Sequence, residues 1–344
     1  MKKITIPEIA KLANISIGTV DRAINDRPGI NPETKKRILD IAKKLHYRPN
    51  RLSKALANNK TVNIGMITLP ESIPFVKLLI EYAESEAASL YDFGCRLTIK
   101  SLKNFDAEEE VNIIQEFIDN DIDAIAIEGL DHPKIIKTIN LAVEKGIAVV
   151  TFNTDVPLSK RLCFVGQNLF QSGEIAANLL CKFMGKAGDL YILQGYHEVA
   201  AHSERLQGFL KIVEKEFPQI NIVKIEECFD DDKIAFDLTQ KAMQQHPEIS
   251  GVYVVASGNI GAAKAILKNK PTGNINFVCN DYVNDIKELL EQDIIDATIL
   301  QDPKTQGSLP INILFKAVFD NERPAQKIYH THIQIMTKHY EMKF

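Results

Sequence analysis

The chain has 344 residues, of which 45% are hydrophobic and 25% are charged, and its formal net charge is −4 at pH 7. This is the composition of a globular protein, which excludes an intrinsically disordered chain, and the length allows more than one domain. We find neither a run of about 18 apolar residues nor an apolar signal core, so we expect no membrane span and a cytoplasmic location.

The first predicted helix begins near residue 6. Thr5 can cap it, and Glu8, three residues further on, completes a capping box. Asn14 tolerates the left-handed conformation that a tight turn between helices needs, so the helix is expected to end there. Its apolar face at helical spacing consists of Ile6, Ile9, Ala10 and Ala13.

Two further helices are expected before residue 46. Ser16 can cap the second, and the third is expected to start at Asn31-Pro32. Three short helices with these faces predict a helix-turn-helix unit, although helix spacing alone leaves open a helical subdomain without DNA function. The inward-facing residues are Val20, Ala23 and Ile24 in the second helix and Ile38, Ile41, Ala42 and Leu45 in the third.

Charge is distributed unevenly along the chain. Residues 1–60 hold 14 Lys and Arg against 5 Asp and Glu, whereas the remainder holds 27 against 40. A basic amino-terminal segment joined to an acidic body is the electrostatic pattern of a nucleic-acid-binding domain attached to a second domain. Charge therefore favours the DNA-binding interpretation of the three helices.

The segments NISIGTVDRAIND and GINPETKKRILDIAKKLHYRPNRLSKAL resemble the headpiece of LacI-family transcription regulators. The resemblance implies that the first residues of the second helix, Ile17, Gly18 and Arg22, enter the major groove. Arg22 can bond a guanine edge bidentately, Ile17 can touch a thymine methyl group, and Gly18 lets the backbone approach. Further DNA contacts are expected at Thr5, Ser16, Thr19, Asp21 and Asn25.

Three of these further contacts have a particular chemistry. Thr19 and Asn25 suit phosphate oxygens. Asp21 departs from the family pattern, in which a small hydroxyl residue is usual, and its carboxylate suits a cytosine amino group.

The segment RPNRLSKALANNK, residues 48–60, resembles the family's hinge, a short helix that forms when two copies meet on DNA. Asn50 is expected to cap it. The resemblance implies that Leu56 inserts between base steps in the minor groove. The alternative is an ordinary apolar residue in a linker.

From Val62 onward, short apolar runs alternate with amphipathic stretches, which predicts parallel sheets covered by helices. Two sets of similar size predict two lobes, and this body resembles the periplasmic-sugar-binding-protein fold. Helices are expected at 75–91, 106–119, 132–145, 171–184, 203–217, 232–246 and 260–269. Strands are expected at 62–68, 95–102, 122–129, 147–153, 161–166, 188–195, 220–228, 251–257, 276–281, 296–301 and 329–337.

In α/β lobes ligands lie beyond the carboxyl ends of the strands, so residues at these ends are expected to line a cleft. Their amide, guanidinium and carboxylate groups suit vicinal hydroxyls, and Phe75 can stack on a sugar ring. For each residue alone, a cap or surface role is the competing interpretation. The predicted effector-binding residues are Phe75, Asn153, Arg205, Ser257, Asn259, Asp281 and Gln301.

Motifs of catalysis and metal binding are missing from the sequence. We find no Gly-rich phosphate loop after the first strand, no G-x-S-x-G and no H-E-x-x-H. The five scattered cysteines predict reduced core residues. His330 and His332 alternate along the expected last strand and share a face, which is more often a surface feature than a metal site. We therefore expect no enzymatic activity, no cofactor and no metal.

Together these features predict a mixed α/β protein with three parts: a headpiece at 1–48, a hinge at 49–61 and a two-lobed effector-binding and dimerisation domain at 62–344. The expected function is that of a homodimeric, cytoplasmic transcription regulator, a repressor, that binds a pseudo-palindromic double-stranded DNA operator. Its effector is expected to be a small polar molecule, a sugar or a sugar derivative. The alternative is a sugar-binding or sensory protein without DNA function.

Overall fold

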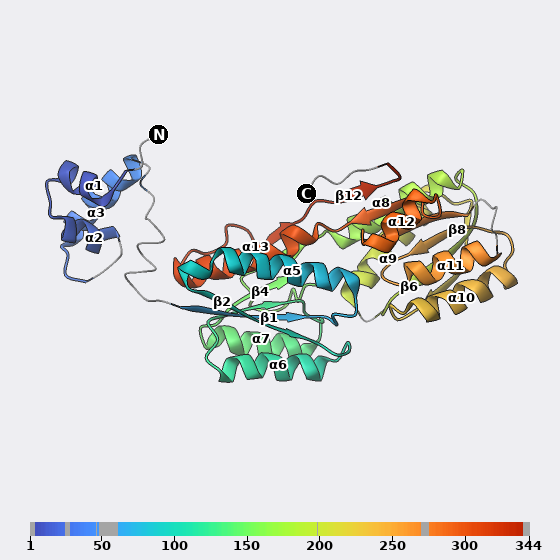
Figure 1. Cartoon of the computed structure of the whole chain (residues 1–344), viewed down its shortest axis with the longest axis horizontal. Helices are drawn as coiled ribbons and strands as arrows, with labels where there is room; N and C mark the ends of the chain where they lie inside the picture. The colour runs from blue at the N-terminus through green and yellow to red at the C-terminus, as the bar shows by residue number, and fades with distance from the viewer. Residues whose placement is uncertain are drawn as a thin grey trace. The chain divides into compact units, whose positions relative to one another are not determined.

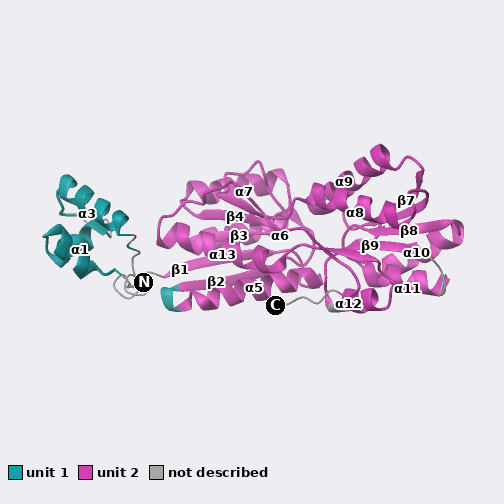
Figure 2. Ribbon diagram, turned by 90° about the horizontal axis from the view of Figure 1, so that it is seen from above, with its two compact units in different colours: residues 1–60, 92–94 teal, residues 61–91, 95–344 magenta. Residues whose placement is uncertain are grey.

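A computed structural model describes residues 4–24, 28–45, 47, 61–197, 199–269 and 275–339. The chain divides into two compact units, residues 1–60 with 92–94 and residues 61–91 with 95–344 (Figure 2). The expected hinge at 49–61 lies almost wholly outside the described residues. The three-part division of the chain therefore stays a prediction.

The headpiece, defined here as described residues 4–47, contains α1 (Ile6–Ala13), α2 (Ile17–Ile24) and α3 (Pro32–Lys44). The predicted helix boundaries are confirmed by their caps. The Glu8 carboxylate accepts from the Thr5 backbone N–H at 2.9 Å, and Asn14 ends α1 with φ of 50°. The Asn31 side chain accepts from the Glu33 N–H at 2.9 Å. Local side-chain chemistry thus sets where these helices start and stop.

The headpiece core is apolar and small. Its fully buried members come from all three helices, with partly buried isoleucines around them. Arg37 of α3 donates to the Ala13 carbonyl at 2.7 Å, which satisfies an acceptor at the end of α1. The buried residues are Ile9, Ala10, Ala13, Val20, Ala23, Ile38 and Ala42.

The amino-terminal lobe is a six-stranded sheet with the order β11-β5-β4-β3-β1-β2, covered by helices on both faces. Figure 1 shows α5 and α13 above this sheet and α6 and α7 below it. The strands are β1 (Val62–Thr68), β2 (Cys95–Ser101), β3 (Ala124–Ile127), β4 (Ala148–Phe152), β5 (Cys163–Gly166) and β11 (Ile328–His330). The helices are α5 (Pro74–Ser89), the short 3-10 helix η1 (Tyr91–Phe93), α6 (Ala107–Asp119), α7 (Pro133–Glu144) and α13 (Pro303–Phe319).

The carboxy-terminal lobe repeats this architecture with the order β12-β10-β9-β8-β6-β7. One face of its sheet packs on α8 and α9 and the other on α10, α11 and α12. The strands are β6 (Gly188–Gln194), β7 (Ile220–Glu227), β8 (Ile249–Val254), β9 (Asn276–Asn280), β10 (Ala297–Leu300) and β12 (Gln334–Met336). The helices are α8 (Leu169–Phe183), α9 (Ala200–Glu216), α10 (Asp232–Gln245), α11 (Asn259–Asn269) and α12 (Asn284–Glu291).

Three chain segments cross between the lobes, after β5, β10 and β11, and they are hydrogen-bonded to one another. The Gln167 side chain donates to the Leu300 carbonyl at 3.0 Å. The Thr331 hydroxyl donates to the Gln301 carbonyl at 3.3 Å, and the Thr331 N–H donates to the Gly166 carbonyl at 2.9 Å. We call this cluster of crossing segments the hinge cluster; it is separate from the predicted hinge at residues 49–61.

The last predicted strand is wrong as a single element. Residues 329–337 divide into β11, which is parallel to β5, and β12, which is antiparallel to β10 in the other lobe. The chain crosses between the lobes at residues 331–333, so a continuous strand there is not possible. His330 ends β11 while His332 lies in the crossing, so the two histidines do not alternate along one strand.

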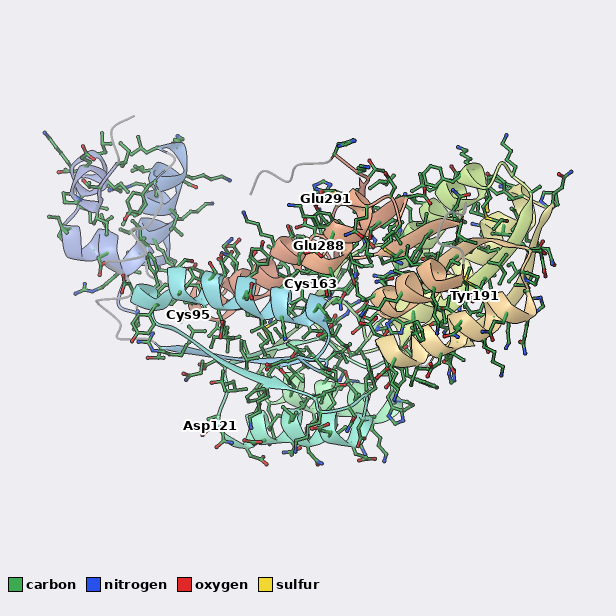
Figure 3. The ribbon with its side chains drawn as sticks, turned by 45° about the vertical axis from the view of Figure 1, so that its right-hand side comes forward. Cys95, Asp121, Cys163, Tyr191, Glu288 and Glu291 are labelled. Atoms are coloured by element: carbon green, nitrogen blue, oxygen red, sulfur yellow. The ribbon has the colours of Figure 1, made fainter. Side chains whose placement is uncertain are left out.

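All five cysteines are buried and free, in agreement with the prediction of reduced core residues. Cys95 begins β2 and Cys163 begins β5, and Figure 3 shows them on separate elements of the amino-terminal lobe. In the described part of the chain, no three His, Cys, Asp or Glu side chains are grouped to hold a metal ion. Among these same residues, no helix combines the length and the apolar character needed to span a membrane.

Candidate functional site

Helix α2 has an inner and an outer face. Val20 and Ala23 are buried in the headpiece core. Ile17, Gly18 and Arg22 are exposed, and Ile17 keeps 56% of its surface accessible. Gly18 and Arg22 are four residues apart and lie on the same side of the helix, and Ile17 lies beside that side at the start of α2.

Gly18 is open on this outer face. A Cβ built at Gly18 meets nothing within 4 Å, so the headpiece fold does not need glycine at this position. Glycine costs a helix interior about 0.5–1 kcal/mol relative to alanine. A residue that is unfavourable for the helix and has no packing role fits close approach of the backbone to a partner.

The other predicted DNA-contacting residues differ in their surroundings. Ser16 and Thr19 cap α2: the Thr19 N–H donates to the Ser16 hydroxyl at 3.2 Å, and the two hydroxyls bond each other at 2.8 Å. Asp21 is half-buried and, together with burial, raises the pKa of Tyr47. Asn25, Asn50 and Leu56 lie outside the described residues.

In the body, Arg205 is the most buried of the predicted effector-binding residues, with 2% of its surface exposed. It lies on α9, which approaches α8 so closely that a Cβ on Gly173 would come within 1.9 Å of the Arg205 carbonyl oxygen. Nη1 of Arg205 donates to the Val255 carbonyl at 3.2 Å. Its Nε and Nη2 have no partner among the described residues, so this buried guanidinium keeps donors available.

Asp281 and Gln301 follow the neighbouring strands β9 and β10. The Gln301 amide NH2 donates to Asp281 Oδ1 at 2.5 Å, and Gln301 Oε1 has no partner in the described structure. Arg205 and the Asn280 amide, which precedes Asp281, both donate to the Val255 carbonyl, at 3.2 and 3.0 Å. Burial raises the pKa of Asp281, and the Arg205 guanidinium acts in the opposite direction. The structure therefore brings Arg205, Asp281 and Gln301 together.

Asn259 and Ser257 lie at the end of β8 in the same lobe. The Asn259 amide NH2 donates to the carbonyls of Ala256 at 3.2 Å and Asn280 at 3.4 Å, and its Oδ1 is unpartnered among the residues described. The Ser257 N–H donates to Asp230 Oδ1 at 3.1 Å. Asn259 thus offers an acceptor beside the Asp281 strand.

The amino-terminal lobe contributes Asn153 and Phe75. Asn153 follows β4 in the left-handed conformation, with φ of 57°, and its amide NH2 donates to Glu128 Oε1 at 2.5 Å. Its Oδ1 has no partner in the described part of the structure. Phe75 is buried in the first turn of α5, where it is one of the helix's core-facing residues.

The two lobes face each other at these strand ends. The Phe105 ring, after β2, lies 4.2 Å from the Tyr196 ring, after β6, between ring centroids. Burial and the carboxylates of Asp155 and Asp131 raise the pKa of Glu204, which precedes Arg205 on α9. Leu130, after β3, also packs with Val199 and Ala201 at the start of α9, so strand ends of the amino-terminal lobe lie beside the helix that carries Arg205. We call Asn153, Arg205, Asn259, Asp281 and Gln301 the interlobe site.

The unpartnered atoms of the interlobe site have a definite hydrogen-bonding character. Asn153 Oδ1, Asn259 Oδ1 and Gln301 Oε1 are acceptors, and Arg205 Nε and Nη2 are donors. Buried polar atoms are costly without a partner, so a ligand here is expected to satisfy them. A neutral molecule with several hydroxyl donors and at least one oxygen acceptor matches this set.

Two functional candidates were missed by sequence reasoning. Glu128 follows β3 and Gln167 follows β5, so both occupy the strand-end positions that predicted the other residues. Gln167 Oε1 is a further unpartnered acceptor within the described structure. Applying the strand-end rule to every strand would have found both.

A separate surface groove of about 1310 Å³ lies between the amino-terminal half of α5, helix α12 and the start of α13. None of the seven predicted effector-binding residues lines it. In the interlobe site Arg205, Gln301 and Asn153 are buried and Asp281 is partly buried.

Two known protein families match separate parts of this chain. Residues 5–50 match the family of bacterial regulatory proteins, lacI family, and residues 64–322 match the periplasmic binding protein domain. Catabolite control protein A of Staphylococcus epidermidis is 26% identical over 210 residues, 61% of this chain and 61% of that protein. The match thus spans about three-fifths of the relative's length.

Solved structures share the fold of the body. A solute-binding protein of an ABC transporter from Burkholderia graminis, in complex with D-arabinose, superposes with a TM-score of 0.73 at 24% identity, covering 81% of this chain and 96% of that one. A solute-binding protein from Actinobacillus succinogenes with bound D-allose gives 0.73 at 23% identity, covering 81% and 98%. The chain therefore belongs to the periplasmic binding protein domain family, and its residues 5–50 match the lacI family of bacterial regulatory proteins.

Proposed function

We propose that this protein is a sequence-specific DNA-binding transcription regulator, a repressor, that acts in the cytoplasm under the control of a small polyhydroxy effector. The observation that carries the proposal is the outer face of α2. Gly18 and Arg22 lie exposed opposite the buried face of the helix, and Ile17 is exposed beside them, in a basic amino-terminal unit. These three side chains suit a thymine methyl group, close backbone approach and a guanine edge.

The proposed effector binds at the interlobe site. Its unpartnered acceptors and the single buried guanidinium support a neutral sugar or polyol and disfavour a phosphorylated one. D-arabinose, D-allose and myo-inositol in structural relatives support the same class of ligand. We infer binding without catalysis.

We further propose that the protein acts as a homodimer on a pseudo-palindromic operator. One headpiece presents only a short reading face, whereas a two-fold pair doubles the contacts and matches two half-sites. In this proposal effector binding changes the distance between the two chains of the dimer at Val62, where the body of each chain begins. That spacing decides whether two copies of the segment around Asn50 and Leu56 pack on the minor groove.

The experiment is a gel shift with fragments of the protein's own upstream region, with and without D-arabinose, D-allose and myo-inositol. Sequence-specific binding that one of these molecules changes is the expected result. Sugar binding without any DNA binding would instead establish the sugar-binding or sensory alternative. Sedimentation of the free protein at micromolar concentration tests the dimer.

A further inference from the structure

Glu128 occupies an unusual position at the floor of the amino-terminal lobe. Its side chain is fully buried at the end of β3, and both carboxylate oxygens have partners. Oε2 accepts from the Leu69 N–H at 2.9 Å, and Oε1 accepts from the Asn153 amide NH2 at 2.5 Å. The carboxylate thus joins the ends of three neighbouring strands, β1, β3 and β4.

An ionised carboxylate can only accept hydrogen bonds, so it determines which way the Asn153 amide turns. The NH2 group of Asn153 must face Glu128, and Oδ1 must face away from it. Oδ1 is also the atom of Asn153 that has no partner in the described structure. The backbone at Asn153 is held as well, because its N–H donates to the Val165 carbonyl at 3.0 Å.

We propose that Glu128 sets the hydrogen-bonding polarity of this corner of the interlobe site, so that Asn153 presents an acceptor and the corner recognises a hydroxyl or amine donor. Glu128 is then a positioning residue that acts through Asn153. The inference rests on the proposed function, because it assigns the specificity of the same effector site.

Protonation of Glu128 would reverse this polarity. Oε2 is held by the Leu69 N–H, so a proton on the carboxyl group belongs on Oε1, where it would donate to Asn153 Oδ1. The amide would then turn its NH2 group toward the effector. Burial raises the pKa of Glu128 to about 7, so the change falls within a range that experiments reach easily.

The surroundings of Glu128 contain little other charge. Among the described residues, no Lys, Arg or His forms an ion pair with it. The titratable neighbour is Glu110 of α6, whose Oε2 accepts from the Leu130 N–H at 3.1 Å. Burial raises the pKa of Glu110 to about 8, and Glu128 adds to this effect.

The first test needs no ligand. In full-length, 15N-labelled protein, the side-chain NH2 signal of Asn153 is followed by NMR between pH 5.5 and 8.5. Asn153→Gly assigns the signal, because glycine tolerates the positive φ of this position. We expect the signal to shift with a midpoint near pH 7 in the wild type and to stay constant in Glu128→Gln. An Asn153 signal that is the same in wild type and in Glu128→Gln across this range would overturn the proposal. A signal that differs between the two proteins but does not shift with pH would show Glu128 ionised throughout and still orienting Asn153.

The second test measures specificity by calorimetry with D-arabinose, D-allose and myo-inositol. A probe that binds the wild type and not Arg205→Ala occupies the interlobe site. For that probe, each hydroxyl is replaced in turn by fluorine, which cannot donate. One replacement is expected to weaken wild-type binding about ten-fold or more and Glu128→Gln binding less than about three-fold.

The two tests separate the two proposals. Equal losses in wild type and Glu128→Gln for every fluorinated analogue would refute the role of Glu128. If none of the three probes bound the wild type, the proposed effector class would fail, while the NMR comparison of wild type with Glu128→Gln would still decide whether Glu128 orients Asn153.

Discussion

The most discriminating substitution is Gly18→Ala, because it should move two measurable quantities in opposite directions. A Cβ at this position meets nothing within 4 Å, so the methyl group adds no strain to the free headpiece. Gly18 is the second residue of α2, so its replacement should stabilise the headpiece by at most the helix-interior value of about 0.5–1 kcal/mol. The same methyl group should obstruct the approach of α2 to the bases and cost about 1–3 kcal/mol per half-site, the range for an added methylene in a close-packed contact.

Both quantities can be measured on the full-length protein. Hydrogen exchange of the α1–α3 amides gives the unfolding free energy of the headpiece, and fluorescence anisotropy with the operator fragment gives DNA affinity. A matched control is Leu12→Ala, which removes an exposed apolar side chain from α1 rather than α2. A Gly18→Ala headpiece that is more stable and binds the operator with unchanged affinity would show that α2 does not approach DNA through Gly18.

Three further predictions use other parts of the molecule. Arg22→Ala should weaken operator binding by about 1–3 kcal/mol and relax specificity at one base position. Lys35 lies on α3, and Lys35→Ala should weaken the binding of all DNA sequences alike, as expected for a phosphate contact. Anisotropy with a set of single-base operator variants distinguishes the two effects. Arg205→Ala should abolish effector binding in calorimetry while leaving effector-free DNA binding intact, and normal ligand affinity in this variant would place the effector elsewhere. Glu110→Gln should flatten the pH dependence of stability. Burial raises the pKa of Glu110 from 4.5 to about 8, so the native state binds a proton that the unfolded chain releases. The free energy of unfolding of the wild type is therefore highest below about pH 4.5 and falls as pH rises toward 8. That fall should be smaller in the variant by on the order of 2–5 kcal/mol in urea titrations, and identical pH profiles would contradict the burial of an acidic Glu110.

Sequence reasoning performed best where structure depends on local chemistry. Thr5, Asn14 and Asn31 mark helix ends through their own side chains or backbone conformation, and the helices begin and end beside them. The strands were predicted equally well from short apolar runs, because a parallel sheet is buried on both faces. The positions of Arg205 and Asp281 followed from the rule that ligands lie beyond strand ends.

The missed features depend on distant parts of the chain. Glu128 and Glu110 look like ordinary surface carboxylates in sequence. They become buried only when α6 packs on the sheet that contains β3, the strand that Glu128 follows. The split of residues 329–337 was missed for a similar reason. Alternating side chains continue through the segment, but the chain leaves one sheet and enters another, as the bond from Thr331 to Gln301 shows.

The position of Gln301 gives the body a mechanical property of its own. Its backbone carbonyl accepts hydrogen bonds from the side chains of Thr331 and Gln306, so it belongs to the hinge cluster, and its side chain lies at the interlobe site. Because the three crossing segments are hydrogen-bonded to one another at one place, we expect the relative motion of the two lobes to be a hinge rotation about that place. An effector that binds Gln301 would therefore contact the hinge itself, so its binding could change the angle between the lobes without acting through other side chains.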